Sequence, residues 1–106
     1  MPTAPSPGPA PAAFDPGRAW DLHPRVSVRP EPFGALLYHF DTRRLSFLKD
    51  RLLLDVVRAL DGRPSARAAC EHAGVPAGSL PRYERALAAL AAGGMLVPRG
   101  VDGRAR

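Results

Sequence analysis

The sequence contains one cysteine and no long apolar run. Cys70 has no second cysteine with which to pair, so an internal disulfide is excluded. No run approaches the roughly 20 apolar residues that a membrane-spanning helix needs, and the N-terminal segment lacks the charged and apolar regions of a signal peptide. We therefore expect a cytoplasmic protein, and its 106 residues suffice for one small domain.

Residue groups that would support catalysis or metal binding are also missing. Cys70 and His72 are two positions apart, so on a helix their side chains point about 200 degrees apart, and no second pair completes a zinc site. His39, Ser46 and the aspartates lack the nucleophile elbow and oxyanion loop of a hydrolase. Gly93-Gly94 ends a predicted helix instead of opening one, so it forms no phosphate loop. We expect a protein that is not an enzyme and that binds no metal or cofactor.

Proline is abundant at the start of the chain. Residues 1–19 hold six of the thirteen prolines, mixed with alanine, serine and glycine, and only Phe14 is large and apolar. Such a segment buries too little surface to offset the entropy of ordering it. The sequence therefore predicts a disordered arm over 1–19, a folded domain over 20–98 and a flexible basic tail over 99–106.

The net charge is mildly basic. It amounts to +5, of which the arm contributes nothing, the domain +3 and the tail +2. This balance indicates an acidic partner or a solvated surface, and it falls short of the positive charge typical of nucleic-acid binding.

Three short strands are predicted where apolar and polar residues alternate with a period of two, over about 25–29, 35–40 and 44–48. Pro30-Glu31-Pro32 must bend or follow a sheet edge, because proline donates no ladder hydrogen bond. Asp41–Arg44 is expected to form a turn. Trp20–Leu22 is expected to fold over the sheet or the helices.

Three helices are predicted after the strands. Asp50, Ser65 and Ser79 are the expected N-caps, and Gly74 suits a left-handed C-terminal cap. Met95–Val97 is expected to tuck under the core or add a brief strand. The order β-β-β-α-α-α predicts an α+β fold, winged helix-turn-helix-like, with a three-stranded antiparallel sheet followed by three helices.

Two binding functions compete for this fold. DNA binding as a small transcriptional regulator needs base-reading side chains on the last helix, but Glu84 separates Arg82 from Arg85, and the remaining exposed residues are alanines. Peptide binding by strand addition needs an exposed edge strand beside a helix with small side chains. The third strand ends a meander and the third helix is rich in alanine, so the sequence favours peptide binding.

The candidate peptide-binding residues lie on that strand and helix. They are Arg43, Arg44, Leu45, Ser46, Phe47, Leu48, Arg82, Arg85, Ala86, Ala89 and Leu90. The arginines would meet acidic residues of the peptide, and a proline at Ser46 would weaken binding if the N–H of that residue faces the guest. Under a second interpretation, Leu45 and Phe47 are core residues and the arginines only keep an exposed edge soluble.

The runs RPEPFGALLYHFDTRRLSFLK, VVRAL, SARAAC, AGV and LPRYERALAALAAGGMLVPR carry a resemblance to a known family. Over about Trp20 to Arg99 the chain resembles the mycofactocin precursor-binding chaperones, which are stand-alone PqqD-like peptide recognition domains. The runs RPEPFGALLYHF and RRLSFLK are the specific part of the match.

The resemblance implies a non-catalytic chaperone. It would bind the leader of the mycofactocin precursor peptide and deliver it to MftC, a radical S-adenosylmethionine (radical SAM) maturase that decarboxylates and crosslinks the peptide's C-terminal Val-Tyr. The iron-sulfur chemistry would belong to that partner. In related domains the leader adds to the third strand, in the cleft against the third helix, which corresponds to Arg44–Leu48 and Arg82–Ala89. The surface that meets the maturase stays open between the first helix and the exposed sheet face, and the protein would be a monomer or a strand-exchanged dimer.

Overall fold

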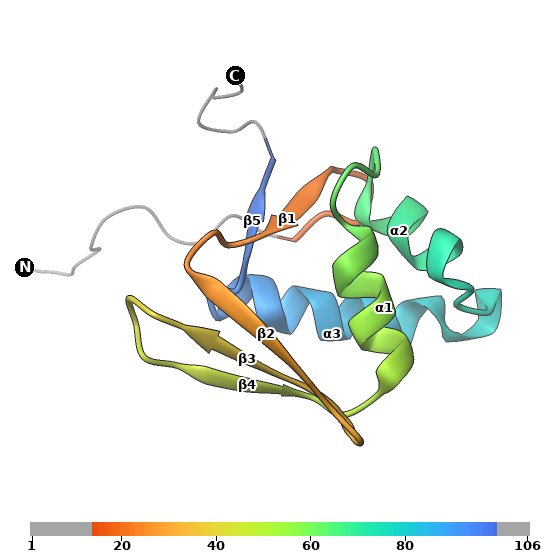
Figure 1. Cartoon of the computed structure of the whole chain (residues 1–106). Helices are drawn as coiled ribbons and strands as arrows, with labels where there is room; N and C mark the ends of the chain where they lie inside the picture. The colour runs from red at the N-terminus through yellow and green to blue at the C-terminus, as the bar shows by residue number, and fades with distance from the viewer. Residues whose placement is uncertain (1–13, 100–106) are drawn as a thin grey trace, which may run out of the picture.

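The computed structural model describes residues 14–99, which form an α+β fold (Figure 1). The elements follow one another as β1 (Trp20–Leu22), β2 (Val26–Glu31), β3 (Gly34–His39), β4 (Leu45–Leu48), α1 (Arg51–Ala59), α2 (Ala66–Ala73), the 3₁₀ turn η1 (Ala77–Ser79), α3 (Leu80–Ala92) and β5 (Leu96–Pro98). A three-stranded antiparallel sheet has the order β2-β3-β4. The predicted sheet and three helices are therefore confirmed.

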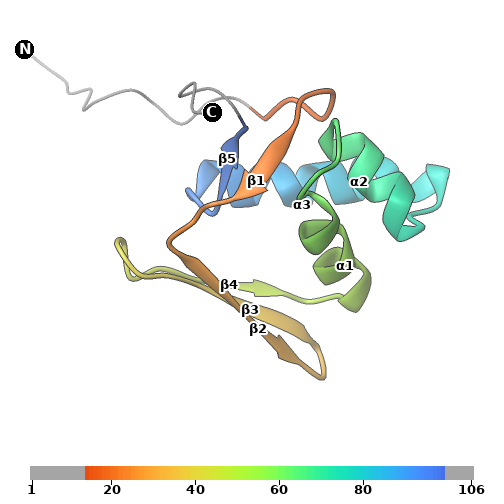
Figure 2. The same cartoon turned by 45° about the horizontal axis from the view of Figure 1, so that its top comes forward.

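A second, two-stranded sheet was only partly foreseen. β1 and β5 pair antiparallel, with Trp20 opposite Pro98 and Leu22 opposite Leu96. The brief strand expected at Met95–Val97 thus exists one residue later, while its partner at Trp20–Leu22 carries no alternation long enough to predict it. The two sheets lie on opposite sides of the molecule, with α3 between them (Figures 1 and 2).

Local sequence explains most helix boundaries. The Asp50 carboxylate accepts a hydrogen bond from the Leu52 N–H at 2.8 Å, and the Ser65 hydroxyl accepts one from Ala68 at 3.0 Å, so both predicted N-caps are confirmed. Gly74 ends α2 with φ +93° as expected. Ser79 makes no capping hydrogen bond, because the preceding residues form a 3₁₀ turn that leads directly into α3.

Residues 14–19, which the sequence assigned to the arm, pack against the domain. Phe14 packs against Trp20 with ring centroids 5.0 Å apart, and the indole N–H of Trp20 donates to the Asp15 carbonyl at 2.9 Å. The carbonyls of Arg18 and Pro16 accept the N–H groups of Ala66 and Arg67, which begin α2. Residues 1–13 of the predicted arm lie outside the described residues.

Arg99, assigned to the tail by the sequence, belongs to the fold. Its guanidinium contacts the Asp21 carboxylate at 2.7 Å and donates to the carbonyls of Leu60 at 2.6 Å and Arg63 at 2.8 Å. It therefore joins β1 to the C-terminal end of α1. The rest of the predicted tail, 100–106, lies outside the described residues.

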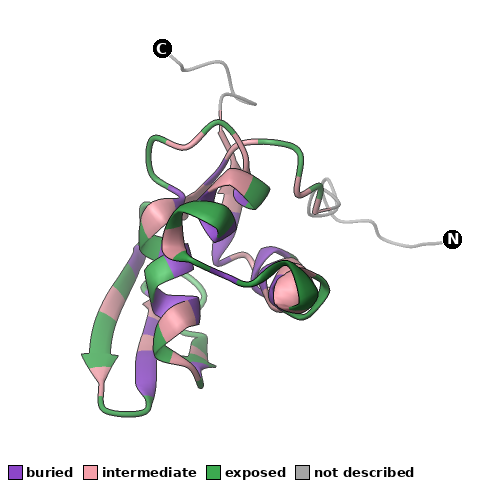
Figure 3. Ribbon diagram, turned by 90° about the vertical axis from the view of Figure 1, so that its right-hand side faces the viewer, coloured by how far each residue is buried: buried purple, intermediate pink, exposed green. Residues whose placement is uncertain are grey.

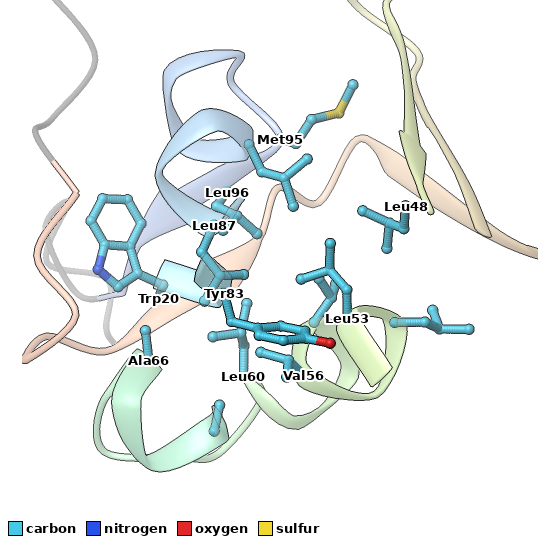
Figure 4. Close-up of a cluster of buried hydrophobic side chains, with 14 of the residues drawn as sticks. Trp20, Leu48, Leu53, Val56, Leu60, Ala66, Tyr83, Leu87, Met95 and Leu96 are labelled. Carbon is cyan, nitrogen blue, oxygen red and sulfur yellow. The ribbon is translucent and has the colours of Figure 1, made fainter. Parts of the chain in front are cut away.

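The core lies between the three-stranded sheet, the helices and the β1–β5 pair. Trp20, Leu48, Leu60, Leu87 and Met95 are among its most deeply buried side chains (Figure 4). Along β3, buried residues alternate with half-buried ones from Ala35 to His39 (Figure 3). The register places Leu37 and His39 on the face toward the core, and His39 is only 3% exposed.

The interpretation of Leu45 and Phe47 as core residues is wrong. They are 57% and 58% exposed, and they lie on the face of the sheet that points away from the helices. Alternation in the sequence indicates that one face of a strand is apolar, but here both faces of β3 and β4 are apolar, so the pattern does not decide which face is buried.

Candidate functional site

The edge of β4 has unpaired backbone groups. The His39 N–H donates to the Arg44 carbonyl at 3.0 Å, and the register pairs Leu37 with Ser46. Hydrogen-bonded and non-bonded pairs alternate along an antiparallel ladder, so Ser46 bonds to β3 while the backbone groups of Leu45 and Phe47 point outward. The register thus keeps the N–H groups of Leu45 and Phe47 out of the β3–β4 ladder, and among residues 14–99 neither donates to the backbone of a turn or loop.

The opposite edge, formed by β2, is better protected. The Phe40 N–H donates to the Arg25 carbonyl at 2.9 Å, so the outward positions of this strand are Val26, Val28 and Pro30. The Val26 N–H is already bonded to the His23 carbonyl at 2.9 Å, and proline has no N–H. The sheet-edge position predicted for Pro30 is confirmed. β4 is thus the edge that offers consecutive outward-facing donors and acceptors.

A cavity of about 400 Å³ lies where β4 leads into α1, on the side of α3. Its lining residues come from the β2–β3 turn, the start of α1 and the first half of α3. They are Phe33, Lys49, Asp50, Arg51, Leu53, Arg82, Tyr83 and Ala86. Three of these side chains are cations and one is a carboxylate, so the cavity combines an apolar wall with positive charge.

Asp50 links the two helices that line this cavity, α1 and α3. One carboxylate oxygen caps α1, and the other accepts a hydrogen bond from the Tyr83 hydroxyl on α3. Figure 4 shows the Tyr83 ring within the core cluster, with its hydroxyl between Leu53 and Val56 of α1. The Tyr83 hydrogen bond holds the pKa of Asp50 below its usual range, while burial and the same bond raise the pKa of Tyr83. At neutral pH the ionised Asp50 carboxylate therefore accepts a hydrogen bond from the neutral Tyr83 hydroxyl.

Arg82 lies at the open side of the cavity. Its guanidinium stands over the Tyr83 ring at 5.0 Å and reaches an Asp50 oxygen at 4.0 Å, and its side chain is 68% exposed. Because the ion pair is long and solvated, it contributes little to stability. The guanidinium also donates to the Tyr83 hydroxyl at 3.3 Å, and its exposed part can meet an anionic group entering from solvent.

Six of the predicted site residues fall into three groups. Ala86 lines the cavity with Arg82, and Ala89 is exposed three residues further along α3, on the same side of the helix. Arg85 is also exposed, but it lies one position before Ala86 and so outside the side of α3 that carries Arg82, Ala86 and Ala89. Leu48 and Leu90 are 0% and 8% exposed, so they are part of the core and offer almost no surface to a peptide.

The predicted arginine rim is divided. Arg43 and Arg44 lie in the turn that precedes β4, where Arg43 has φ +64°, whereas Arg82 lies beyond the opposite end of that strand. β4 spans about 14 Å at the usual rise of a strand, so these cations flank the edge at its two ends and form no single cluster.

Sequence reasoning missed several residues that line the cavity. Phe33, Lys49, Arg51, Leu53 and Tyr83 were not predicted as site residues, and Asp50 was predicted only as a helix cap. Tyr83 and Leu53 carry helical spacing that assigns them to the core, which is correct for their rings and methyl groups. The capping role of Asp50 was the one available signal, because it places a carboxylate next to β4.

The described residues contain no group of three metal-ligating side chains close enough to hold an ion. Cys70 is fully buried, and burial raises the pKa of its thiol. No helix within residues 14–99 is sufficiently long and apolar to cross a membrane.

The fold and the site define a small α+β domain whose unpaired β4 edge ends at a partly cationic cavity, a geometry suited to an added strand. The model of the peptide chaperone MftB family matches residues 19–97. The peptide chaperones MftB of Mycobacterium ulcerans and Mycobacterium tuberculosis are each 55% identical to this chain, over 94% and 92% of it and 94% and 93% of their own lengths. The corresponding protein of Mycolicibacterium smegmatis is 52% identical over 85% of this chain and 88% of its own.

The chain belongs to the peptide chaperone MftB family. No solved structure matches it significantly. The family predicted from the sequence, and with it the function as a peptide chaperone, is confirmed, and nothing in these comparisons supports the alternative of a DNA-binding regulator.

Proposed function

We propose that this protein binds the leader of the mycofactocin precursor peptide as an added strand on β4 and presents the peptide to the radical SAM maturase MftC. The observation that carries the proposal is the pair of outward-facing backbone positions at Leu45 and Phe47, on an edge that ends at the cavity beside α3. Each position offers one donor and one acceptor, so four backbone hydrogen bonds are available to an extended peptide.

The cavity supports selectivity for an acidic or apolar leader side chain. Phe33, Leu53 and Ala86 provide the apolar wall, and Arg82 provides an exposed cation at its mouth. Arg43 and Arg44 at the other end of the strand would meet a second acidic residue. Binding residues would therefore be Arg43 to Phe47 on the strand side and Arg82, Arg85, Ala86 and Ala89 on α3, with Leu48 and Leu90 supporting them from the core.

The β-β-β-α-α-α order with this edge supports assignment to the winged helix-turn-helix-like PqqD-like domains. The protein would act without catalysis, by proximity: holding the leader raises the effective concentration of the far end of the peptide at the maturase. The cytoplasmic location and the choice between monomer and strand-exchanged dimer stay predictions from the sequence.

Amide hydrogen exchange with a synthetic leader peptide tests the register. The N–H groups of Leu45 and Phe47 should become protected when the leader binds, while the N–H of Val28 on the β2 edge should stay unprotected. A matched pair of variants separates backbone from side chain. Phe47→Pro removes the outward N–H and should weaken leader binding by about tenfold, whereas Phe47→Ala keeps it and should bind more tightly than the proline variant. Protection on β2 alone, or equal affinities for the two variants, would contradict strand addition at β4.

A further inference from the structure

The face of the three-stranded sheet that points away from the helices is covered with large apolar side chains. Four of them are exposed: Phe33 at 47%, Phe40 at 50%, Leu45 at 57% and Phe47 at 58%. The register adds the half-buried Leu36 and Tyr38 to the same face. No other large apolar residue is exposed between residues 14 and 99, so the exposed apolar surface of the described chain is concentrated here.

These side chains form ordered pairs. The rings of Phe33 and Phe47 lie 6.2 Å apart, and those of Tyr38 and Phe40 meet edge to face at 5.2 Å. The Arg25 guanidinium lies 5.9 Å from the centre of the Phe40 ring. Aromatic residues beside arginine are typical of the centres of protein interfaces, while contiguous apolar patches are unusual on surfaces that stay in water.

Charge indicates what kind of partner fits. Residues 25–49 carry five cations (Arg25, Arg29, Arg43, Arg44 and Lys49) and two carboxylates (Glu31 and Asp41), which gives +3. Arg25 is ion-paired with Asp41 and Arg29 with Glu31, so the excess charge is that of Arg43, Arg44 and Lys49, at the two ends of β4. Pairing this face with a second copy would bring two such sheets together, which like-charge repulsion disfavours. A different protein with carboxylates around an apolar patch would satisfy both features of the face.

We infer that this outer sheet face binds a folded partner protein, which contributes an apolar patch bordered by carboxylates. The outer face is defined by Phe33, Leu36, Tyr38, Phe40, Leu45 and Phe47. The inference rests on the proposed function, in which that protein is the maturase receiving the peptide.

The outer face adjoins the proposed peptide site. Phe33 lines the cavity beside α3 and also contacts Phe47 on the outer face. Leu45 and Phe47 extend their side chains onto the outer face and their backbone groups toward the β4 edge. A leader on β4 and a protein on the outer face would therefore share a border, and each would bury surface that the other leaves exposed. Leader binding should strengthen docking, and docking should strengthen leader binding by the same factor.

The experiment measures two affinities for each variant of the full chain, one for a synthetic leader peptide and one for purified maturase. Phe40→Thr with Tyr38→Thr removes apolar surface away from the β4 edge and keeps residues that favour strands. Arg29→Glu reverses charge on the same face, where Arg29 is 77% exposed. Arg58→Glu is the matched control, because it makes the same charge reversal at an exposed position of α1, the other candidate surface for the maturase.

Outer-face docking predicts that Phe40→Thr with Tyr38→Thr, and separately Arg29→Glu, weaken maturase binding by about tenfold or more while leader affinity changes by less than about twofold. Arg58→Glu should leave both affinities near those of the parent protein. If the parent protein binds leader and maturase but the outer-face variants bind the maturase normally, this inference fails and the proposed function survives. If the parent protein does not bind the leader, the proposed function itself fails.

Two other occupants give distinct results that would overturn the inference. If a second copy covers this face, the parent protein alone would sediment as a dimer, and the outer-face variants would sediment as monomers. Binding of the protein to phosphatidylglycerol vesicles, lost in the same variants while maturase affinity is unchanged, would identify the face as a lipid contact.

Discussion

The hydroxyl of Tyr83 on α3 donates a hydrogen bond to the carboxylate of Asp50, the residue that caps α1 directly after β4. This bond ties the helix beside the cavity to the end of the strand whose edge is unpaired. The relative position of α3 and β4, and so the shape of the proposed peptide site, depends on a contact between residues 33 positions apart.

Tyr83→Phe should lower the free energy of unfolding at pH 7 by about 1–2 kcal/mol, because a partly exposed carboxylate loses its phenol donor. The pKa of Asp50 is lowered in the folded protein, so its contribution is present above the unfolded pKa of about 3.9 and is lost as pH falls through the folded pKa. The difference between parent and variant in urea unfolding should therefore shrink below about pH 4.

Tyr38→Phe is the control for that measurement, since it removes a phenol hydroxyl from the outer sheet face, at a residue that takes no part in the Asp50 hydrogen bonds. The pKa of Tyr83 is raised, so the phenol contribution should persist below the unfolded pKa of about 10 and fall as pH rises through the folded pKa. If the stability difference between the parent protein and Tyr83→Phe is constant from pH 3 to pH 7, the effect of the Tyr83 hydroxyl does not depend on the Asp50 carboxylate.

Gly34→Ala should destabilise the fold by several kcal/mol, on the order of 3 or more. Gly34 has φ +147°, and a Cβ there would lie 2.0 Å from the Leu48 carbonyl oxygen, in the backbone of β4. Gly78→Ala is the matched control, because a Cβ at Gly78 meets nothing within 4 Å. Thermal unfolding of the two variants should separate them clearly, and equal melting temperatures would show that β4 can move aside.

Ser46→Pro should destabilise the fold rather than weaken leader binding selectively. The Ser46 N–H belongs to a hydrogen-bonded pair with Leu37 on β3, so proline would leave the Leu37 carbonyl unpaired at a cost of about 1–3 kcal/mol. Ser46→Ala should be nearly neutral by the same urea assay. A folded Ser46→Pro protein with parent stability and lost leader affinity would mean that the Ser46 N–H faces the guest.

Arg99→Lys should lower the free energy of unfolding by about 2 kcal/mol, nearly as much as Arg99→Ala. The guanidinium contacts Asp21 while donating to the carbonyls of Leu60 and Arg63, and a single ammonium cannot reproduce this fork. Arg58→Lys, at an exposed position in the last turn of α1, should change stability by less than about 0.5 kcal/mol. If Arg99→Lys is as stable as the parent protein while Arg99→Ala is not, the contact is a simple charge attraction.

The sequence predicted the elements whose signals are local. Asp50 and Ser65 cap helices through their own side chains, and the three strands alternate over several residues, so these predictions needed no knowledge of the tertiary structure. The pairing of β1 with β5 was beyond reach, because three-residue strands separated by most of the chain have no periodic pattern of their own.

The candidate site was predicted more coarsely than the fold. The choice of β4 and α3 as the binding elements stays a prediction. Leu48 and Leu90 are core residues, and the sequence does not decide on which side of the sheet Leu45 and Phe47 lie. Which face of a two-sided apolar sheet is covered depends on where the helices pack, and that is a long-range property. Tyr83 shows the same difficulty, since its ring obeys the core pattern and only its hydroxyl reaches the cavity.

The pairing of β1 with β5 brings residues near both ends of the described chain together, on the side of the molecule opposite the three-stranded sheet (Figures 1 and 2). Affinity tags, fluorophores or a fused maturase attached through a linker beside β1 or β5 would therefore start on the side away from the β4 edge. The same proximity should allow the old ends to be joined and the chain reopened at the exposed Asp61-Gly62, which would yield a permuted domain with its recognition strand intact.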